Sequence, residues 1–200
     1  MIKTIVLASN NKNKLLEFQK ILEPYNYIVK SQSQMGVNIE VEETGTTYKE
    51  NAYLKAKAIY ELTNLPVVSD DSGLEVDFLD KKPGVMSSRF LGETATDKEK
   101  RQYILEKLKS VEKEKRTARF VCCICYIDEN GETHFFEEKC EGFISEKEIG
   151  DNGFGYDPIF EYNGRTFAQM SKSEKNEVSH RGKAFNKFLN YIETINVGNK

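Results

Sequence analysis

Runs of apolar residues alternate with polar turns and helically spaced stripes along the first part of the chain. Residues 2–8 form a continuous apolar run rich in β-branched side chains, which predicts a strand covered on both faces. A polar turn follows, and Leu15, Phe18 and Leu22 then recur at helical spacing before Pro24. The order of strand, polar loop and helix is typical of an α/β protein.

A second helix is predicted over about residues 48–62, after a short strand at 27–30. Thr47 and Glu50 have the spacing of a capping box, and Pro66 lies just beyond the expected end. Lys55 shares a face of this helix with apolar residues, where a lysine needs an anionic partner, gives up its charge or extends to solvent. An internal carboxylate or a phosphate explains its position best. The apolar residues of that face are Tyr48, Ala52, Ile59 and Leu62.

Two adjacent carboxylates, Asp70 and Asp71, follow a short β-branched run at residues 67–68. Ser72 and Gly73 then predict a turn before a strand at 74–78, so the acids are expected at a strand end, where open α/β folds place ligands. Neighbouring carboxylates repel unless they share a cation or one holds a proton, and Mg²⁺ would resolve the repulsion. A surface Asp-Asp turn is the alternative that these residues leave open.

The remaining pattern predicts a hairpin and further helices. Asp97 can cap a helix that runs through Lys109, and residues 112–116 are a charge run expected to form a solvated loop. Residues 118–127 and 132–140 have the pattern of strands and flank a turn at 128–131, which is a strong hairpin signal. We therefore expect one domain over residues 1–200, with two lobes and a mixed sheet.

Composition narrows the classes of partner. The net charge of −3 supplies no basic field, so we expect no binding to nucleic acid. The first apolar run is too short for a signal peptide and no later run approaches a membrane span, so we expect a cytoplasmic protein with no membrane partner. Three of the four cysteines crowd one predicted strand and suit no tetrahedral zinc site, so buried reduced thiols are expected.

Three polar segments supply parts for a nucleoside phosphate site. The turn at 9–14 offers loop amides and two lysines to a phosphate, although an ordinary Asn-rich helix start is the alternative. The segment 153–158 combines glycines with aromatic residues that either stack on a flat ligand or pack inward. His180 and Arg181 offer donors to carbonyl or phosphate oxygens, or are solvent-facing charges. Together with the acids they suggest a nucleoside phosphate bound with Mg²⁺.

The order and spacing of six strings, from the first strand to the last helix, resemble the inosine triphosphate pyrophosphatase family. The strings are Ser9-x-Asn11-x-x-Lys14, Glu42-Glu43-Thr44-Gly45, Glu50-Asn51-Ala52 with Lys55-Ala56, Ser69-Asp70-Asp71-Ser72-Gly73-Leu74, Gly153-Phe154-Gly155-Tyr156-Asp157-Pro158 and Ser179-His180-Arg181-Gly182. The resemblance implies a two-lobed α/β fold, with a long mixed β-sheet flanked by helices and a central nucleotide cleft. It also implies a homodimer that uses Mg²⁺ to hydrolyse ITP, dITP and XTP to the monophosphate and pyrophosphate, as a house-cleaning enzyme of the nucleotide pool.

The resemblance also implies roles for individual residues. Asp71 would be the general base and would also contact Mg²⁺, with Glu42 as a metal ligand and Glu43 and Asp70 in the same acidic group. Lys55 would be an internal charge partner of the acids. The phosphates would be held by Ser9, Asn10, Asn11, Lys12, Asn13, Lys14 and Ser72. The base and sugar would be held by Phe154, Gly155, Tyr156, Asp157, Lys175, His180 and Arg181.

One string departs from the family pattern, and two other functions remain open. Relatives commonly show an aromatic-Ser-Ala-Arg-Tyr string where this chain has Met86-Ser87-Ser88-Arg89-Phe90, an edge that the resemblance associates with a dimer contact. A pyrophosphatase for pyrimidine or modified nucleotides would use the same acids and lysines. A nucleotide-binding module without catalysis is the other alternative, and the intact acid pair argues against it.

Overall fold

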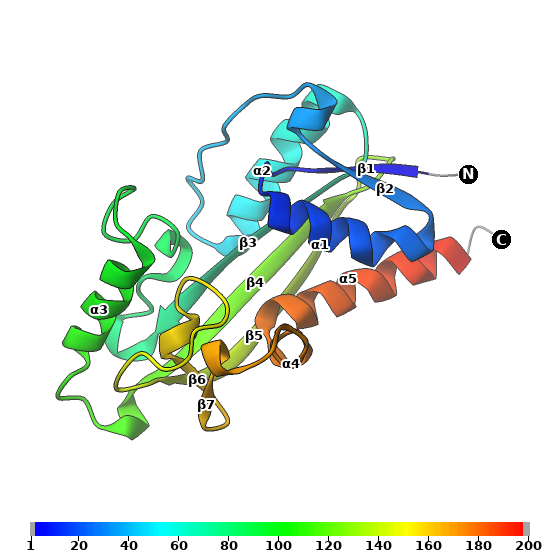
Figure 1. Cartoon of the computed structure of the whole chain (residues 1–200). Helices are drawn as coiled ribbons and strands as arrows, with labels where there is room; N and C mark the ends of the chain where they lie inside the picture. Colours follow the sequence, from blue (N-terminus) through cyan, green and yellow to red (C-terminus); the bar gives the residue numbers. More distant parts are fainter. Residues whose placement is uncertain (1–2, 198–200) are drawn as a thin grey trace. The chain divides into compact units, whose positions relative to one another are not determined.

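The computed structural model describes residues 3–197, which form five α-helices and seven strands joined by loops and short 3₁₀ turns (Figure 1). The strands are β1 (Lys3–Leu7), β2 (Tyr27–Ser31), β3 (Val67–Val76), β4 (Thr117–Ile127), β5 (Thr133–Ile144), β6 (Phe160–Tyr162) and β7 (Arg165–Thr166). The helices are α1 (Lys12–Leu22), α2 (Tyr48–Thr63), α3 (Asp97–Lys107), α4 (Lys172–Val178) and α5 (His180–Val197). Ile2, the first residue of the predicted opening strand, lies outside the described residues.

The strands belong to one mixed sheet with the order β2-β1-β3-β4-β5-β6-β7. β1 is parallel to both β2 and β3, whereas β6 is antiparallel to both β5 and β7. Parallel neighbours need a crossover connection, and α1 and α2 supply it after β1 and β2. The predicted α/β class, a mixed sheet flanked by helices, is confirmed.

The chain divides into two compact units. The first unit comprises Met1–Asp71, Cys123–Glu137 and Ala184–Lys200, and the second comprises Ser72–Cys122 and Glu138–Lys183. The boundaries fall inside β3, β4, β5 and α5, so both units contain parts of these elements. Each unit has a hydrophobic cluster of its own.

Helices cover both faces of the sheet in the first unit. Ala52, Ala56 and Ile59 of α2 share a buried cluster with sheet residues that include Cys125 and Ile127 of β4. Tyr126 lies between these two on the strand, so its side chain points to the opposite face. There its ring packs against Phe188 of α5, with ring centroids 5.5 Å apart. On that face α1 also contacts α5, because Phe18 packs against Phe188 and Phe185.

The core of the second unit is built around stacked aromatic rings. The rings of Phe120 on β4 and Phe167 are nearly parallel, with centroids 5.8 Å apart, and Phe160 of β6 lies 4.7 Å from Phe120. Leu74 of β3 and Ile104 of α3 belong to the same buried cluster. Each aromatic pair adds about 0.5–1.5 kcal/mol beyond the burial of its surface.

Strand β3 contradicts the predicted turn after the acids. It continues without interruption from Val67 to Val76, so Asp70 and Asp71 lie inside a buried strand rather than at its end. The strand pairs with β1 at Val67 and Val68 and has β4 as its other hydrogen-bonded neighbour in the sheet, and this pairing outweighs the local turn preference of Ser72 and Gly73. The alternative of a surface Asp-Asp turn is wrong for the same reason.

The capping box of α2 is confirmed, while two details of the predicted helices are wrong. The Thr47 side chain accepts from the Glu50 amide, and the Glu50 side chain accepts from the Thr47 amide. Leu62 is 57% exposed rather than buried, because it lies in the last turn of α2. The N-cap of α3 is Thr96, because its hydroxyl accepts the amide three residues on, and Asp97 is the first helical residue.

The charge run 112–116 is not wholly solvated, because Arg116 is buried. Its guanidinium donates to the carbonyl oxygens of Leu108, Ile144 and Ser145 at 2.6, 2.7 and 2.5 Å. A guanidinium has five donors in a rigid fork, so it can pair several backbone carbonyls at once without an acidic partner. The buried Arg116 side chain therefore binds this loop to the backbone of neighbouring segments.

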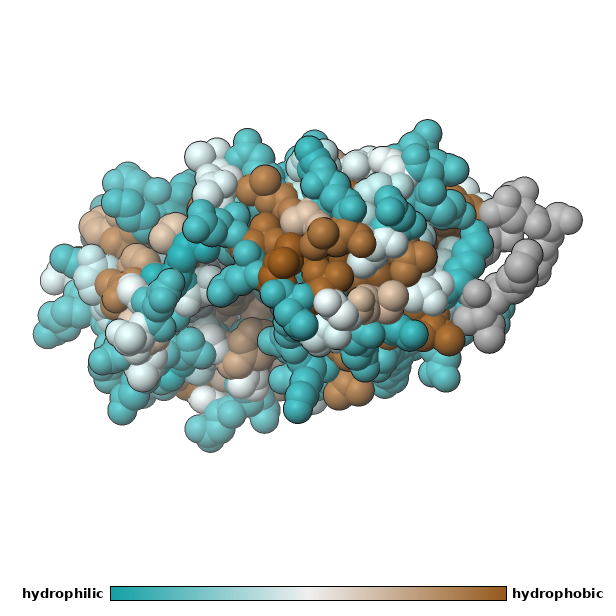
Figure 2. Space-filling model, turned by 90° about the horizontal axis from the view of Figure 1, so that it is seen from above, coloured by the Kyte–Doolittle hydropathy of each residue, from teal (hydrophilic) through white to brown (hydrophobic). Residues whose placement is uncertain are grey.

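The cysteines are free and buried, which confirms the predicted reduced thiols. They are Cys122, Cys123, Cys125 and Cys140. Burial raises the pKa of the Cys123 and Cys125 thiols to about 12, so both stay protonated at neutral pH. None of the described helices has the length and apolar character needed to cross a membrane. The face in Figure 2 is mostly hydrophilic, with a group of hydrophobic residues near its middle.

Candidate active site

Three carboxylates and two lysines form ion pairs around two adjacent residues of β3 in the first unit. Lys14 Nζ of α1 lies 2.8 Å from Asp70 Oδ1, and Lys55 Nζ of α2 lies 2.5 Å from Glu43 Oε1 and 3.7 Å from Asp71 Oδ1. This cluster, which we term the acid–lysine group, carries one negative charge in excess when all five side chains are ionised. The structure therefore pairs each of the four catalytic residues predicted from the sequence with another of them, and Glu43 joins the pair of Lys55 and Asp71.

The alternation of β3 explains why each aspartate has its own lysine. Successive side chains of a strand point to opposite faces of the sheet, so Asp70 and Asp71 cannot share one side. Lys55 belongs to α2, which covers one face, and Lys14 belongs to α1 on the other. The predicted internal partner for Lys55 is confirmed, because Glu43 and Asp71 lie next to its ammonium group.

Burial sets the proton affinity of Asp71. Asp71 is only 8% exposed, and this burial raises the pKa of its carboxyl from the ordinary value, although the Lys55 charge opposes the rise. The Asn51 side chain also favours the charged form of Asp71, and the Gly45 amide fixes that side chain by donating to its Oδ1 at 2.8 Å. Burial would lower the pKa of Lys55, but the surrounding carboxylates raise it.

The polar turn before α1 begins the helix and presents exposed side chains. Asn11 is the N-cap, and its Oδ1 accepts from the amides of Asn13 and Lys14 at 2.9 and 3.2 Å. Ser9 Oγ accepts from the Asn11 amide, and Asn10 Oδ1 accepts from the Ser33 amide. The helix-start interpretation is therefore correct for Asn11. Exposed side chains are those of Asn10, Asn11, Lys12 and Asn13.

In the second unit, residues 153–157 form a tight loop with one aromatic ring outside and one inside. Phe154 is 69% exposed, and its amide donates to Asp157 Oδ2 at 2.9 Å. Lys175 Nζ lies 2.6 Å from the same carboxylate oxygen and 4.9 Å from the centre of the Phe154 ring. Tyr156 is buried, and its hydroxyl donates to the Ser87 carbonyl at 2.9 Å. Only Phe154 is available to stack on a ligand.

His180 and Arg181 begin α5 and also belong to the second unit. His180 is buried, and its ring stacks on Phe120, with centroids 4.7 Å apart and planes 10° apart. Arg181 Nη2 lies 3.4 Å from Ser72 Oγ. A Cβ on Gly182 would come 1.7 Å from the Asn176 carbonyl oxygen, so only glycine allows this close approach of α5 to the end of α4.

Residues 5–191 match the Ham1 family, which is nearly the whole chain. The chain belongs to the Ham1 family. Two relatives are named dITP/XTP pyrophosphatase. The Bacillus subtilis (strain 168) protein is 43% identical and covers 96% of this chain and 98% of its own. The Clostridium perfringens (strain 13 / Type A) protein is 40% identical and covers 97% and 99%. The resemblance drawn from the six strings is confirmed.

Solved Ham1 structures agree with the fold of this Ham1 chain. The Staphylococcus aureus Ham1 protein superposes with a TM-score of 0.90 at 40% identity, covering 96% of this chain and 99% of that one. The nucleoside-triphosphatase / dITP/XTP pyrophosphatase of Mycobacterium abscessus gives 0.80 at 37% identity, covering 92% and 97%. The mixed sheet described above is thus a Ham1 fold.

The predicted metal ligands of this Ham1 chain differ in their surroundings. Glu43 and Asp71 converge on Lys55, whereas Glu42 is exposed. In residues 3–197, one group of three side chains has possible ligand atoms within 4.8 Å of one another, and it lies elsewhere in the first unit. It consists of Asp128, Glu132 and His134. Sequence reasoning missed this group, although its members lie within seven residues of one another, in and beside the turn between β4 and β5. Its imidazole is already engaged, because Tyr191 Oη lies 2.9 Å from His134 Nε2.

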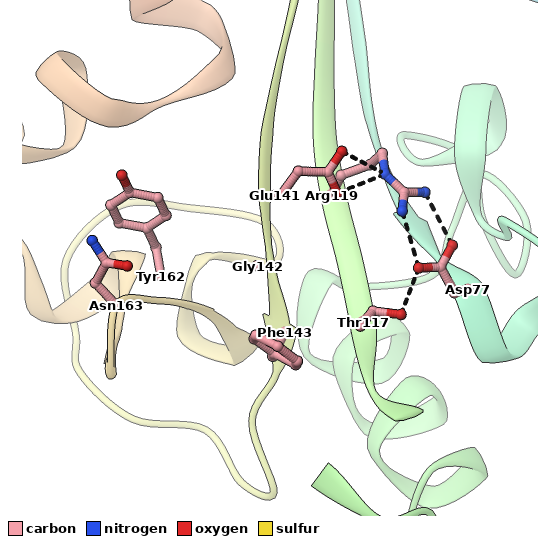
Figure 3. A pocket seen from close by; sticks show the side chains of 8 residues that line it. All are labelled: Asp77, Thr117, Arg119, Glu141, Gly142, Phe143, Tyr162 and Asn163. Atoms are coloured by element: carbon pink, nitrogen blue, oxygen red, sulfur yellow. Dashed lines mark hydrogen bonds and ion pairs between the residues drawn. The ribbon is translucent and has the colours of Figure 1, made fainter. Parts of the chain in front are cut away.

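A pocket of about 300 Å³ in the second unit contains none of the predicted site residues (Figure 3). Its eight lining residues are those labelled in the figure. Arg119 at its wall donates to Asp77 at 3.0 Å through each terminal nitrogen and to Glu141 at 2.9 Å through Nε, and the Thr117 hydroxyl donates to Asp77 at 2.6 Å. Because these donors already bind carboxylates, the Arg119 guanidinium has little capacity left to bind an anionic ligand.

Proposed function

We propose that this Ham1 chain hydrolyses non-standard purine nucleoside triphosphates, namely ITP, dITP and XTP, to the monophosphate and pyrophosphate. The observation that carries the proposal is the acid–lysine group, a buried pair of neighbouring aspartates with a lysine on each side. The names of relatives that match nearly the full chain at 40–44% identity support the same reaction. Removal of these nucleotides from the pool would be its role.

Asp71 is the general base in this proposal. Its carboxylate takes a proton from water as the water oxygen bonds to the α-phosphorus, and the bond from that phosphorus to the bridging oxygen breaks as pyrophosphate leaves. Burial raises the pKa of Asp71 toward the working pH, which improves a carboxylate as a proton acceptor. Lys14 and Lys55 offset the negative charge of the reacting phosphates.

The acid–lysine group suits Mg²⁺ as the cofactor. Its excess negative charge lies on two buried carboxylates and one partly buried carboxylate, and Glu43 and Asp71 already converge on one cation, the Lys55 ammonium group. Asp71, Glu43 and Glu42 would hold the metal. When bound, Mg²⁺ supplies positive charge to the phosphates and lowers the pKa of a coordinated water. The turn at Ser9–Lys14 and Ser72 would contact the phosphate chain.

The residues of the second unit hold the base and sugar in this proposal. The exposed Phe154 ring offers a stacking face, and the Lys175–Asp157 pair lies beside it. His180 and Arg181 offer donors to the 6-oxo group of hypoxanthine or xanthine. Adenine presents an amino group there, and a site that leaves its donors unpaired rejects such a ligand effectively.

The family resemblance supports two further proposals. We infer a homodimer, which light scattering after gel filtration would detect as a particle with the mass of two chains. We also infer a cytoplasmic location, which fractionation of the source cells would test. A particle with the mass of one chain at working concentration would contradict the first proposal.

Pyrophosphate release from a substrate panel tests the proposed reaction. ITP, XTP, ATP and GTP are each incubated with Mg²⁺ and with EDTA, and pyrophosphate and monophosphate are quantified. We expect metal-dependent release from ITP and XTP and little from ATP or GTP. Release of orthophosphate, or equal rates on ATP and ITP, would contradict the proposal.

A further inference from the structure

Gly155, at the centre of the loop 153–157, is held on both sides by helix α3. Its amide donates to Asp97 Oδ2 at 3.1 Å, and its carbonyl accepts from Arg101 Nη1 at 2.8 Å. Gly155 has a φ of +59°, a conformation that glycine adopts without strain and that a flexible loop would otherwise leave readily. Asp97 and Arg101 of α3 therefore hold both the amide and the carbonyl of Gly155.

Holding the backbone of Gly155 also restricts the two residues next to it in the chain. Phe154 on one side presents the exposed ring, and Tyr156 on the other side is anchored to the Ser87 carbonyl. The same helix holds that anchor, because the buried Lys100 donates to the Ser88 carbonyl at 2.6 Å. The direction of the Phe154 ring thus depends on contacts made by α3.

Arg101 differs from an arginine that serves stability alone. Arg116 places its three guanidinium nitrogens on three backbone carbonyls. Arg101 binds the Gly155 carbonyl and Glu148, but its buried Nε has no hydrogen-bond partner among the described residues. A buried donor without a partner is unfavourable, so the net stabilisation by Arg101 is reduced. Of its two contacts, the one with the Gly155 carbonyl acts directly on the loop.

We propose that Asp97 and Arg101 are positioning residues that hold the loop 153–157 in the conformation that binds the base. The inference rests on the proposed function, in which this loop holds the base and sugar. The two residues do not contact the nucleotide. They restrict Gly155, and through it Phe154, before the substrate arrives, so their loss weakens substrate binding more than it slows the chemical step.

The kinetic test separates KM from kcat. Arg101→Met should raise the KM for ITP about tenfold while kcat stays within about threefold, because a charged donor to the loop is lost but the acid–lysine group is intact. A lower fraction of folded protein would reduce apparent kcat and leave KM unchanged, so a purely structural role gives the opposite pattern. Arg101→Lys retains a donor and should restore most of the affinity.

Three variants on or beside the same helix complete the test. Asp97→Ala removes the other Gly155 contact and should also raise KM, which keeps the test decisive if Arg101→Met fails to fold. Lys98→Met alters an exposed cation of α3 and should leave KM unchanged. Glu148→Gln removes the ion-pair partner of Arg101 but leaves the Gly155 contacts. Equal KM changes in Glu148→Gln and Arg101→Met, or none in Arg101→Met and Asp97→Ala, would overturn the proposal.

A fluorescence measurement tests the loop without catalysis. The chain contains no tryptophan, so Phe154→Trp creates a single reporter on the loop. Combined with Arg101→Met, this reporter should show lower anisotropy and stronger acrylamide quenching than it does alone. If the unaltered chain released no pyrophosphate from ITP, the proposed function would fail while this result still decided the role of α3. Pyrophosphate release with an unchanged KM and unchanged fluorescence in Arg101→Met would overturn the inference alone.

Discussion

Asp71 and Asp77 both meet a basic side chain, yet their surroundings move their pKa values in opposite directions. Asp71 is buried, its nearest oxygen is 3.7 Å from Lys55, and burial raises its pKa. The side chain of Asp77 is 28% exposed and receives two hydrogen bonds of 3.0 Å from Arg119, which hold its pKa well below the usual range. For Asp71 the nearby positive charge does not offset the effect of burial on the pKa, whereas for Asp77 the hydrogen bonds from Arg119 outweigh it.

The difference separates a reactive carboxylate from a structural one. A fork-shaped guanidinium satisfies a carboxylate geometrically and electrostatically, so Asp77 has little remaining affinity for a proton. Burial, which the longer contact with Lys55 does not offset, leaves Asp71 with affinity for a proton or a metal ion, which a catalytic base requires. The structure thus indicates which aspartate to expect in chemistry and which in stability, and each expectation can be tested.

The largest effect should come from Asp71→Asn. Because an amide cannot accept the proton of water, pyrophosphate release from ITP should fall about 10²- to 10⁴-fold. Nucleotide binding, measured by calorimetry with a non-hydrolysable ITP analogue, should survive. The matched control is Asp77→Asn, which should keep turnover within about threefold because Asp77 lies outside the acid–lysine group. Equal losses in the two variants would contradict the contrast.

Lys55→Met should have the next largest effect. It removes the cation that opposes the raised pKa of Asp71, so the base becomes protonated over a wider pH range. Turnover near neutral pH should fall about tenfold or more, and the acidic limb of the pH profile should move to higher pH. Lys57→Met on the same helix is the control, because Lys57 is half exposed and pairs with Glu61. An unshifted acidic limb would remove Lys55 from this role.

Lys14→Ala should act on substrate rather than on the base. Its ammonium group lies 2.8 Å from Asp70, and in the proposed function it contacts the phosphates of the substrate. We expect the KM for ITP to rise about tenfold, whereas inhibition by IMP should change less than about twofold, because the monophosphate lacks the terminal phosphates. Equal changes for ITP and IMP would exclude Lys14 from the triphosphate clamp.

The smallest effect concerns stability against pH. The pKa of Asp71 in the folded protein lies above its value of about 3.9 in the unfolded chain. Ionised Asp71 therefore destabilises the folded state. This cost grows as pH rises from about 3.9 to the folded pKa and is fully present above the folded pKa. The folded pKa of Asp77 is depressed, so its stabilisation is present above about 3.9 and is lost as pH falls toward the folded value.

Urea unfolding at several pH values measures both contributions. At neutral pH, Asp71→Asn should be as stable as the original chain or more stable. Asp77→Asn should lose about 1–3 kcal/mol, because a charge-assisted pair is broken. The deficit of Asp77→Asn should shrink as the solution is acidified below about pH 4. A constant deficit across this range would show that ionisation of Asp77 is not its source.

Local patterns predicted much of this fold because they reflect short-range physics. The capping box of α2 was predicted from Thr47 and Glu50, since a cap involves residues close in sequence. The turn predicted at Ser72 and Gly73 was wrong because pairing with distant strands decided the conformation of β3. Turn preference is a local quantity, and sheet pairing overrides it.

The candidate site follows the same division. The sequence placed Lys55 on an apolar face and so predicted an internal anionic partner, which the structure identifies as Glu43 and Asp71. No local signal indicated that Arg101 of a highly charged helix would hold Gly155, because that contact depends on a tertiary approach of segments far apart in sequence. The predicted roles of the phosphate and base residues stay predictions until they are tested with substrate.

Hydrolysis of ITP in water enriched in oxygen-18 tests the central claim most directly. The account places attack of water on the α-phosphorus, so mass spectrometry should find one heavy oxygen in IMP and none in pyrophosphate. The same distribution should occur in the slow residual turnover of Lys14→Ala. Heavy oxygen in pyrophosphate, or the formation of IDP and orthophosphate, would contradict the assignment of a pyrophosphate-releasing site to the acid–lysine group.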